Sequence, residues 1–403
     1  MTDPHAAPPP PPPDSPAPPP GPPPAVTPAR PPRRGRSLLG LFFGASLAFN
    51  LLALLVVALL LIGLSVSGLF GGRSSDSLEE EFHSGKASAG DKVAIIKVDG
   101  VIVEGLMAYP HREIEQAAKD KHVKAVVLRI NSPGGSITAS DELHRRLVEL
   151  RDGKDGRPGK PLIASMGGLA ASGGYYVAMP ARKVYAERTT LTGSIGVFAS
   201  FPNVKELGDR YGVKVYTIKA GRIKDAGSPF AEMTPEERYV WQDMVDHAYK
   251  QFLDVVEAGR PELKGKLEDF VIDREVTVRV PEDVKEGDRV VRKTVEKKVR
   301  YRRQRADGGI WTADKAKEYG LIDDLGYLDD AIKEAAKQAG LGDKYRAITY
   351  ERPKSLADLL LGVKAPAPAV QLDAAALSNG LTPRLWYLAP QSELAGLTAT
   401  LGR

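Results

Sequence analysis

Residues 125–136 decide the fold, and they read AVVLRINSPGGS. The first six residues are apolar except for Arg129, and they have the length and composition typical of a buried strand. The glycine pair after Pro133 lets the backbone turn sharply, and a helical pattern begins at Ser136. A strand that leads directly into a helix is the repeating unit of an α/β fold.

The same alternation of strands and helices continues on both sides of this stretch. Apolar, β-branched runs predict strands at Val93–Val98, Ala125–Ile130, Leu162–Met166, Lys183–Ala186 and Lys214–Ile218. We therefore predict one α/β domain over residues 91–350, in which helical patterns separate the strands.

Two helices are predicted in detail. One covers Ser136–Arg151 and places its leucines on a single face. The other begins at Thr234, where Glu237 completes a capping box, and runs to about Ala258. Apolar residues recur at every fourth position of this second helix, and we predict that this stripe packs against the core. The stripe consists of Val240, Met244, Ala248 and Phe252.

The amino-terminal residues predict a membrane anchor. Residues 1–36 are rich in proline and predict a disordered tail, whereas residues 37–70 contain no charged side chain and are long enough for a transmembrane helix. A cleavable signal peptide is the alternative. Four arginines within 30–36 place the tail in the cytoplasm by the positive-inside rule. The sequence thus predicts a single-pass plasma-membrane protein, with a linker at 71–90 and an extracytoplasmic domain.

Residues 273–305 differ in kind from the rest of the domain. Valines alternate with charged residues on both sides of Gly287, which predicts a β-hairpin inserted into the domain. A solvated face is the simpler interpretation of its charges, and contact with anionic lipid or a neighbouring subunit is the alternative.

The net charge of +5 is small for 403 residues and does not indicate a nucleic-acid partner. Residues 351–403 form a tail without clear periodicity.

Two segments contain candidate catalytic groups. The glycines of Asn131–Ser136 expose backbone amides beside a helix start, where they can stabilise an oxyanion. Ser172 lies among small residues in GGLAASGGYY, residues 167–176, where a strand gives way to a helix. Its hydroxyl is a candidate nucleophile, and an ordinary helix N-cap is the alternative.

A nucleophilic serine needs a base, and none of the six histidines lies in a recognisable catalytic context. The chain has no G-x-S-x-G elbow, no H-E-x-x-H motif and no cysteine, so Ser-His-Asp and zinc chemistry are disfavoured. No metal or other cofactor is expected. Lys224, in GRIKDAGSP at 221–229, is the remaining candidate base, although the residues alone favour a surface lysine there.

Four motifs together resemble the S49 peptidases, and the match is closest to the short, single-domain signal peptide peptidase A type. The resemblance covers about residues 93–340. Its motifs are NSPGG at 131–135, AASGGYY at 170–176, LTGSIGV at 191–197 and the lysine segment at 218–229. The hairpin at 273–305 departs from the common pattern of the family, and so does Gly308-Gly309, where an arginine often follows glycine.

The resemblance implies a role for each residue. Ser172 would be the nucleophile, Lys224 its general base and Ser194 the residue that orients the lysine, while the amides of Gly135 and Gly173 would form the oxyanion hole. It also implies a ClpP/crotonase-like spiral fold and a homo-oligomeric ring in which adjacent subunits share each site. The expected substrates are remnant signal peptides and other apolar peptides at the membrane.

Two other functions are compatible with the fold that the resemblance implies. A crotonase-like acyl-CoA enzyme would use similar glycine amides, but export separates it from cytoplasmic coenzyme A. A non-catalytic membrane scaffold would not need the serine and lysine motifs, which are intact.

Overall fold

The computed structural model describes residues 49–52, 54–56, 78–286, 289–351 and 385–388. The chain divides into two units, Met1–Ser74 and Ser75–Arg403. In the first unit, residues 49–52 and 54–56 are helical, and the rest of the predicted anchor at 37–70 lies outside the described residues, as does the predicted tail at 1–36. None of the helices formed by described residues is long and apolar enough to cross a membrane.

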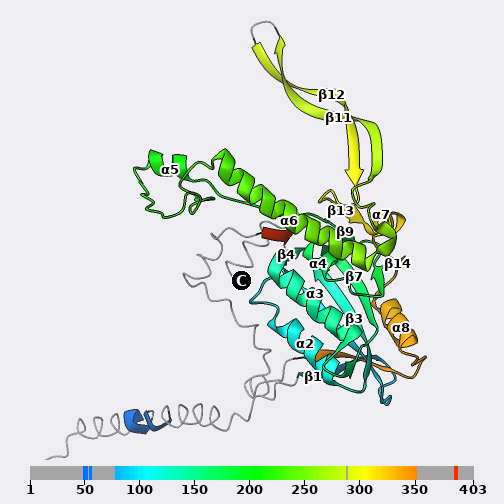
Figure 1. Cartoon of the computed structure of the whole chain (residues 1–403). Coiled ribbons are helices and arrows are strands. Elements are labelled where there is room, and N and C mark those ends of the chain that lie inside the picture. Colours follow the sequence, from blue (N-terminus) through cyan, green and yellow to red (C-terminus); the bar gives the residue numbers. More distant parts are fainter. Residues whose placement is uncertain (1–48, 53, 57–77, 287–288, 352–384, 389–403) are drawn as a thin grey trace, which may run out of the picture. The chain divides into compact units, whose positions relative to one another are not determined.

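The second unit is built on a mixed sheet with the strand order β1-β15-β2-β3-β7-β8-β14, from which β9 continues beside the end of β7 (Figure 1). In this order, neighbouring strands are parallel for β15, β2, β3, β7, β8 and β14. Strand β1 pairs antiparallel with β15, and β13 pairs antiparallel with β9. These strands are β1 Glu79–Gly85, β2 Lys92–Asp99, β3 Val123–Ser132, β7 Leu162–Ala171, β8 Lys183–Ala186, β9 Leu191–Gly193, β13 Ile310–Thr312, β14 Asp324–Leu325 and β15 Arg346–Glu351.

Helices cover both faces of this sheet, as an α/β fold requires. Alternate residues of β2 face opposite sides, so Ala94 and Ile96 pack in one core with α2 and α3, while Val93 and Ile95 pack in the other with α8. The helices are α2 Ala108–Lys119, α3 Ile137–Asp152, α4 Gly173–Tyr176, α5 Lys205–Arg210, α6 Pro235–Gly259, α7 Ala313–Glu318 and α8 Leu328–Gln338, and Pro261–Leu263 forms a 3-10 turn. Short strands β5 Gly153–Lys154 and β6 Arg157–Pro158 form a separate pair.

Both detailed helix predictions are confirmed at their starts. Ser136 caps α3 by accepting a hydrogen bond from the Ala139 amide at 3.2 Å. Thr234 and Glu237 form the predicted capping box of α6, with bonds of 3.2 and 2.9 Å. These caps depend on residues three positions apart, which is why the sequence alone locates them.

The amino-terminal half of α6 does not pack as predicted. Ala248 and Phe252 are buried, but Met244 is 45% exposed. Val240 is half-buried, and the buried residues of α6 all lie in its second half, so the first half of the predicted stripe does not reach the core.

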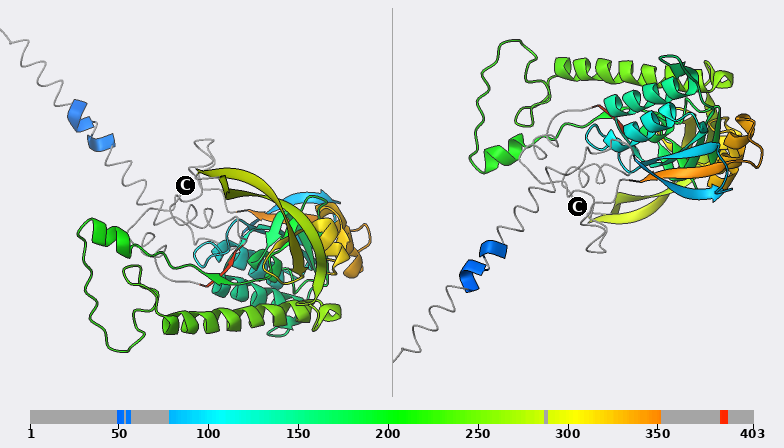
Figure 2. Two further views of the ribbon diagram at one scale, coloured as in Figure 1. Left: turned by 90° about the horizontal axis from the view of Figure 1, so that it is seen from above. Right: turned by 90° about the horizontal axis from the view of Figure 1, so that it is seen from below.

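The prediction of a strand at Lys214–Ile218 is wrong. These residues have no regular structure, and the Ile218 side chain is fully exposed. The whole segment between α5 and α6 extends away from the sheet (Figures 1 and 2). A strand needs a neighbouring strand for its backbone hydrogen bonds, and no strand formed by the described residues lies beside this one.

Two segments predicted to lack regular structure contain strands. Residues 79–85 of the predicted linker form β1, which pairs with β15. Charged and exposed residues dominate this edge strand, so it carries no apolar signal. In the predicted tail, β16 Leu385–Leu388 pairs with β4 Gly134–Ser136 and with β10 Phe198–Ala199.

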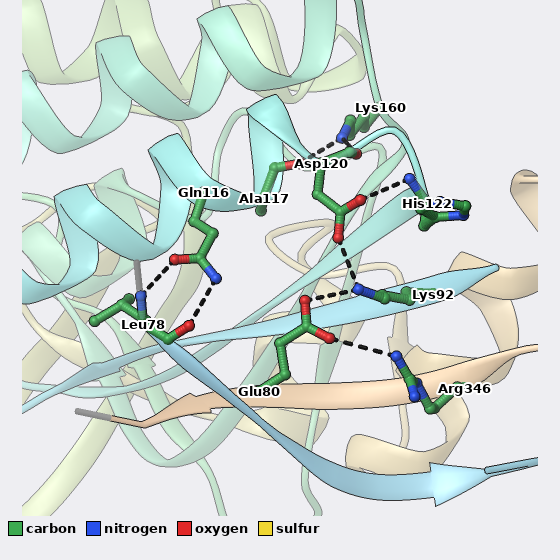
Figure 3. Close-up of polar contacts among 9 residues, drawn as sticks. All are labelled: Leu78, Glu80, Lys92, Gln116, Ala117, Asp120, His122, Lys160 and Arg346. Carbon is green, nitrogen blue, oxygen red and sulfur yellow. Dashed lines mark hydrogen bonds and ion pairs between the residues drawn. The ribbon is translucent and has the colours of Figure 1, made fainter. Parts of the chain in front are cut away.

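A polar network joins β1 to the end of α2 (Figure 3). The Lys92 Nζ donates to Glu80 Oε1 at 2.7 Å and to Asp120 Oδ2 at 2.9 Å. At the carboxyl end of α2, the Lys160 ammonium donates to the carbonyls of Ala117 and Asp120. Burial lowers the pKa of Lys160 to about 8. A cation at this end of the helix stabilises its last carbonyl groups, so we assign Lys160 a structural role.

The hairpin predicted at 273–305 is formed by the antiparallel strands β11 Phe270–Glu286 and β12 Arg289–Gln304, so it begins three residues earlier than predicted. It extends beyond the sheet (Figure 1), and within the described part of the chain its two strands pair only with each other. Cross-strand ion pairs such as Arg279–Glu296, at 3.0 Å, follow the length of the hairpin.

Glu113 makes the stability of the domain depend on pH. Its side chain is 1% exposed on α2, and its Oε2 accepts a hydrogen bond from the Lys97 amide at 3.3 Å. Burial raises the pKa of Glu113 from its usual 4.5 to about 8. Between these two values the folded chain retains a proton that the unfolded chain releases. The free energy of unfolding should therefore fall as the pH rises through this range, by roughly a few kcal/mol in total.

We expect Glu113→Gln to remove this part of the pH dependence, because glutamine stays neutral and can still accept the Lys97 hydrogen bond. Urea denaturation midpoints at pH 5 and pH 8 measure the effect, and the variant should gain most over the wild type at pH 8. Glu115→Gln, on the exposed side of the same helix, is the control and should retain the wild-type decline. An equal decline in Glu113→Gln would show that the buried carboxyl group is not its source.

Candidate active site

Ser172 lies at the junction of β7 and α4 in a strained conformation. Its φ of 55° and ψ of −118° are unusual for a residue other than glycine. Its amide donates to the Gly193 carbonyl at 2.7 Å, and its carbonyl accepts from the Tyr176 amide at 2.9 Å. Such strain costs about 1–3 kcal/mol and is concentrated at functional sites, where the surrounding structure maintains it.

The Ser172 hydroxyl has no hydrogen-bond partner among the described residues, although the side chain is fully buried. Ser172 stands at the N-cap position of α4 but makes no side-chain capping bond. The ordinary capping role, which the sequence left open, is therefore not what this hydroxyl does. A buried hydroxyl without a partner is costly, and this cost again suggests a role in chemistry.

The structure brings Gly173 and Gly135 together beside Ser172. A methyl group on Gly173 would lie 3.1 Å from the Gly135 nitrogen and 2.5 Å from the Ser140 Oγ. No larger residue fits here without displacement. The two amides that were predicted to stabilise an oxyanion thus come from elements that touch each other, the start of α4 and the strand β4.

Strand β4 is fixed on one side by the backbone of Ile102. The Ile102 amide donates to the Gly134 carbonyl at 2.8 Å, and the Ser136 amide donates to the Ile102 carbonyl at 2.8 Å. On the other side, β16 pairs antiparallel with β4, with Tyr387 opposite Gly135. A peptide segment in extended conformation therefore lies directly along the glycine strand of the site.

Ser194 lies close to Ser172 but is bonded elsewhere. It follows Gly193, whose carbonyl accepts the Ser172 amide, and it also has a positive φ, of 51°. The Ser194 Oγ donates to the Gly308 carbonyl at 3.0 Å, and its amide donates to the Gly309 carbonyl at 2.9 Å. The site thus contains Ser194, held by the turn after the hairpin.

Lys224 is not brought to the other predicted residues within the described chain. It is exposed, its amide donates to the Gly221 carbonyl at 3.2 Å, and no hydrogen bond joins its side chain to Ser172 or Ser194 among the described contacts. It belongs to the segment between α5 and α6 that extends from the domain (Figure 2). One protomer as described therefore holds four of the five predicted site residues together.

Comparison with known proteins identifies the family. The model of peptidase family S49 matches residues 154–274 and 289–342. A putative protease of Synechocystis sp. is 33% identical over 301 residues, which cover 74% of this chain and 92% of that protein. The chain belongs to peptidase family S49.

Other relatives in this family differ in length. Protease 4 of Salmonella typhi is 31% identical over 282 residues, and the match covers 68% of this chain but only 39% of that protein. The putative signal peptide peptidase SppA of Enterococcus faecium is 29% identical over 281 residues, with 67% and 70% covered. This S49 peptidase thus corresponds to a part of the longer relative and to most of the shorter one.

The sequence interpretation missed the residues that support α4 in this S49 peptidase. The Tyr175 hydroxyl donates to the Leu321 carbonyl at 2.6 Å, and the Tyr176 hydroxyl donates to Asp141 Oδ1 at 2.7 Å. The ring of His144 packs edge-on against Tyr176, and burial lowers the pKa of this histidine to about 4. Only the two tyrosines gave a sequence signal, since they directly follow the serine motif.

Ser140 was also missed. It is fully buried on α3, and its Oγ, which lies against Gly173, has no hydrogen-bond partner among the described residues. Ser140 shares a helix face with Leu143 and Leu147, so its position within a leucine stripe is the signal that could have identified it.

A cleft of about 730 Å³ opens beside β4, between the start of α3 and the middle of α6. Apolar and acidic side chains share its wall, and Ser136 lies at its edge with the Oγ bonded to Glu104 Oε1 at 2.8 Å. Strand β4 borders both this cleft and the peptide segment β16. The cleft therefore offers space for side chains of a strand that is bound to β4. The lining residues are Glu104, Ser136, Ile137, Thr138, Asp243, Met244, His247, Ala248 and Gln251.

Proposed function

We propose that this S49 peptidase is a serine endopeptidase in which Ser172 attacks the peptide carbonyl. The observation that carries the proposal is the Ser172 hydroxyl, which is buried without a partner on a strained turn, beside the glycine amides. The amides of Gly135 and Gly173 would donate to the oxyanion of the tetrahedral intermediate. The Ser172 Oγ bonds to the carbonyl carbon as its proton passes to a base, the C–N bond then breaks, and the amine leaves with that proton. Water then hydrolyses the ester formed on Ser172, which releases the acyl half of the substrate and restores the hydroxyl.

A base must take the proton from Ser172, and we assign it to Lys224 of a neighbouring copy. Two features support this assignment: the lysine segment extends from its own domain, and it exposes large apolar side chains. Tyr216 is 83% exposed and Ile218 is fully exposed, as expected for a surface that another copy covers. Docking of that copy would desolvate the lysine, which favours the neutral form that a base requires. Ser194 would then orient the lysine.

The substrate would bind as an extended strand in the position of β16. Main-chain pairing with β4 would give affinity for a peptide of any sequence. The neighbouring cleft would select among substrate side chains by their size and charge. In this arrangement the scissile carbonyl lies next to the Gly135 amide. The carboxyl-terminal segment that contains β16 would have to leave before a substrate of another chain can bind.

We further propose that residues 37–70 anchor the enzyme in the plasma membrane as one helix, with the amino terminus in the cytoplasm. The charge-free stretch and the arginines before it support this topology. The peptidase domain would then lie outside the cytoplasm as a ClpP/crotonase-like fold within a homo-oligomeric ring. Its substrates would be remnant signal peptides and other apolar peptides near the membrane. The name of the Enterococcus faecium relative, a putative signal peptide peptidase, agrees with this substrate class.

Mixing two inactive variants tests the shared site. Ser172→Ala and Lys224→Ala should each lose cleavage of a quenched apolar peptide by the detergent-solubilised full chain. If each site takes its serine from one copy and its lysine from the next, random mixing at equal amounts should restore about a quarter of the sites. No recovery, despite subunit exchange demonstrated with labelled copies, would refute sharing between subunits. Full activity of either single variant would refute the assigned residue.

A further inference from the structure

The β11–β12 hairpin has two long edges that no described strand covers. β11 has 17 residues and β12 has 16, and together they form a separate two-stranded sheet. Open edges of this length expose rows of backbone groups that attract another strand, and an isolated two-stranded ribbon is only marginally stable. The S49 family model leaves residues 275–288 unmatched, so much of β11 lies outside the part of the chain that matches this model.

The two faces of the hairpin differ. On one face, valines stand opposite each other, as in Val276 with Val299 and Val280 with Val295. The other face carries cross-strand ion pairs, including Asp273–Arg300 at 2.7 Å and Glu275–Lys298 at 3.1 Å. The Val299 side chain is 40% exposed. The valine face also carries an ion pair, Glu282–Lys297 at 2.9 Å, so the two faces differ in their valines and not in the presence of charge. The described residues leave these valines only partly covered.

The two strands also differ in charge. β11 contains five acidic and three basic residues, whereas β12 contains one acidic and eight basic residues. Inside the hairpin this difference is favourable, because Glu275 stands opposite Arg300 and Asp283 stands opposite Arg292. The outer edge of β12 is equally complementary to the β11 of another copy. Two β12 edges side by side would repel each other.

We propose that the hairpins of neighbouring copies join edge to edge, with β12 of one copy beside β11 of the next. This contact is head-to-tail, so it can repeat from copy to copy and closes into a ring where the rotation between copies allows it. A two-fold contact between identical edges would instead bring the basic strands together. Pro281 offers no N–H to a ladder, so we place the contact on residues 270–280, the longer uninterrupted part of β11. The joined valine faces then form one continuous surface of a larger sheet.

This interaction surface goes beyond the proposed peptidase function and shares with it only the assembly of copies. It can be tested by disulfide cross-linking, because the natural chain contains no cysteine and gives no background. Thr277→Cys places a thiol on β11, and Lys298→Cys places one on β12 in a separate chain. Both positions lie on the face opposite the valines, where they stand opposite each other within a hairpin.

The two full-length variants are mixed in detergent, exchanged and oxidised, and cross-linked pairs are resolved by denaturing electrophoresis. We expect cross-links in the mixture and none in either variant alone. Glu296→Cys and Arg300→Cys, used in place of Lys298→Cys, cover shifts of register along the same face. Lys119→Cys, exposed on α2, is the control and should not cross-link to Thr277→Cys.

Cross-linking of Lys298→Cys with itself would overturn the proposal in favour of a two-fold contact. Absence of cross-links from every mixture would overturn it as well, whether light scattering finds the copies assembled or monomeric. A further variant of the Glu296→Cys chain has Lys297, Lys298 and Arg300 changed to Glu, which reverses three charges of β12. Cross-linking of this chain to Thr277→Cys copies should fall at least tenfold. Peptide cleavage, measured separately on each preparation, reports on the proposed function and does not enter this result.

Discussion

Ser172→Ala is expected to lower kcat for peptide cleavage by roughly 10⁶-fold, the loss found when a serine nucleophile is removed from a serine protease. The substitution removes only the Oγ, which has no hydrogen-bond partner in the described structure. The positive φ of residue 172 is unchanged in alanine, so the strain and the fold should persist. Turnover of a quenched apolar peptide and the thermal midpoint Tm measure the two effects separately.

Ser140→Ala is the matched control for this experiment, because Ser140 is also fully buried and its Oγ also lacks a partner. We expect Ser140→Ala to retain activity within about tenfold, since its hydroxyl lies against Gly173 and is not on the nucleophile turn. A Ser172→Ala variant that folds and keeps a tenth of the wild-type rate would eliminate Ser172 as the nucleophile. Equal losses in both variants would point to a packing effect.

The parts of the structure that local signals determine could be predicted from the sequence. The β8 strand spans the predicted residues Lys183–Ala186, and the cap of α6 is formed by the predicted pair of Thr234 and Glu237. The order of parallel strands and helices follows from the same alternation. In each case the deciding residues are neighbours in sequence, so no knowledge of distant contacts is needed.

Features that depend on distant partners could not be predicted. β1 owes its pairing to β15, more than 250 residues further along the chain, and its own residues are charged. Residues 214–218 have the composition of a strand, but no described strand is available to pair with them. The β-propensity of a segment therefore fails to predict a strand such as β1, and it predicts a strand at 214–218 that does not form, because the presence of a partner strand decides both cases.

The candidate site divides in the same way. Ser172 and the two glycines were identified from motifs, but the positive φ of Ser172 and the contact between Gly173 and Gly135 arise from the packing of β7 against β3 and β9. Ser194 was assigned to orient a lysine, which stays a prediction, and in the described chain its hydroxyl donates to the Gly308 carbonyl. Lys224 remains a prediction whose test needs a second copy.

Gly135→Ala is expected to lower kcat strongly and to reduce stability. An added methyl group would lie 1.8 Å from the Ile102 carbonyl oxygen and 2.5 Å from its carbon, and both atoms belong to the backbone that fixes β4. β4 must therefore shift, which would move the Gly135 amide away from the oxyanion. Loss of one oxyanion donor costs about 10²–10³-fold in kcat, and the overpacking costs typically about 1–3 kcal/mol of stability.

Gly168→Ala controls for the loss of a glycine near the same site. The nearest atom to its added methyl group is Asn131 Oδ1 at 3.8 Å, an ordinary contact, so activity and Tm should stay close to those of the wild type. For Gly135→Ala, an oxyanion role requires kcat to fall by at least 10²-fold in protein that is still folded at the assay temperature. If instead the folded variant retains kcat and only KM rises, β4 binds the peptide strand but its amide does not act on the transition state.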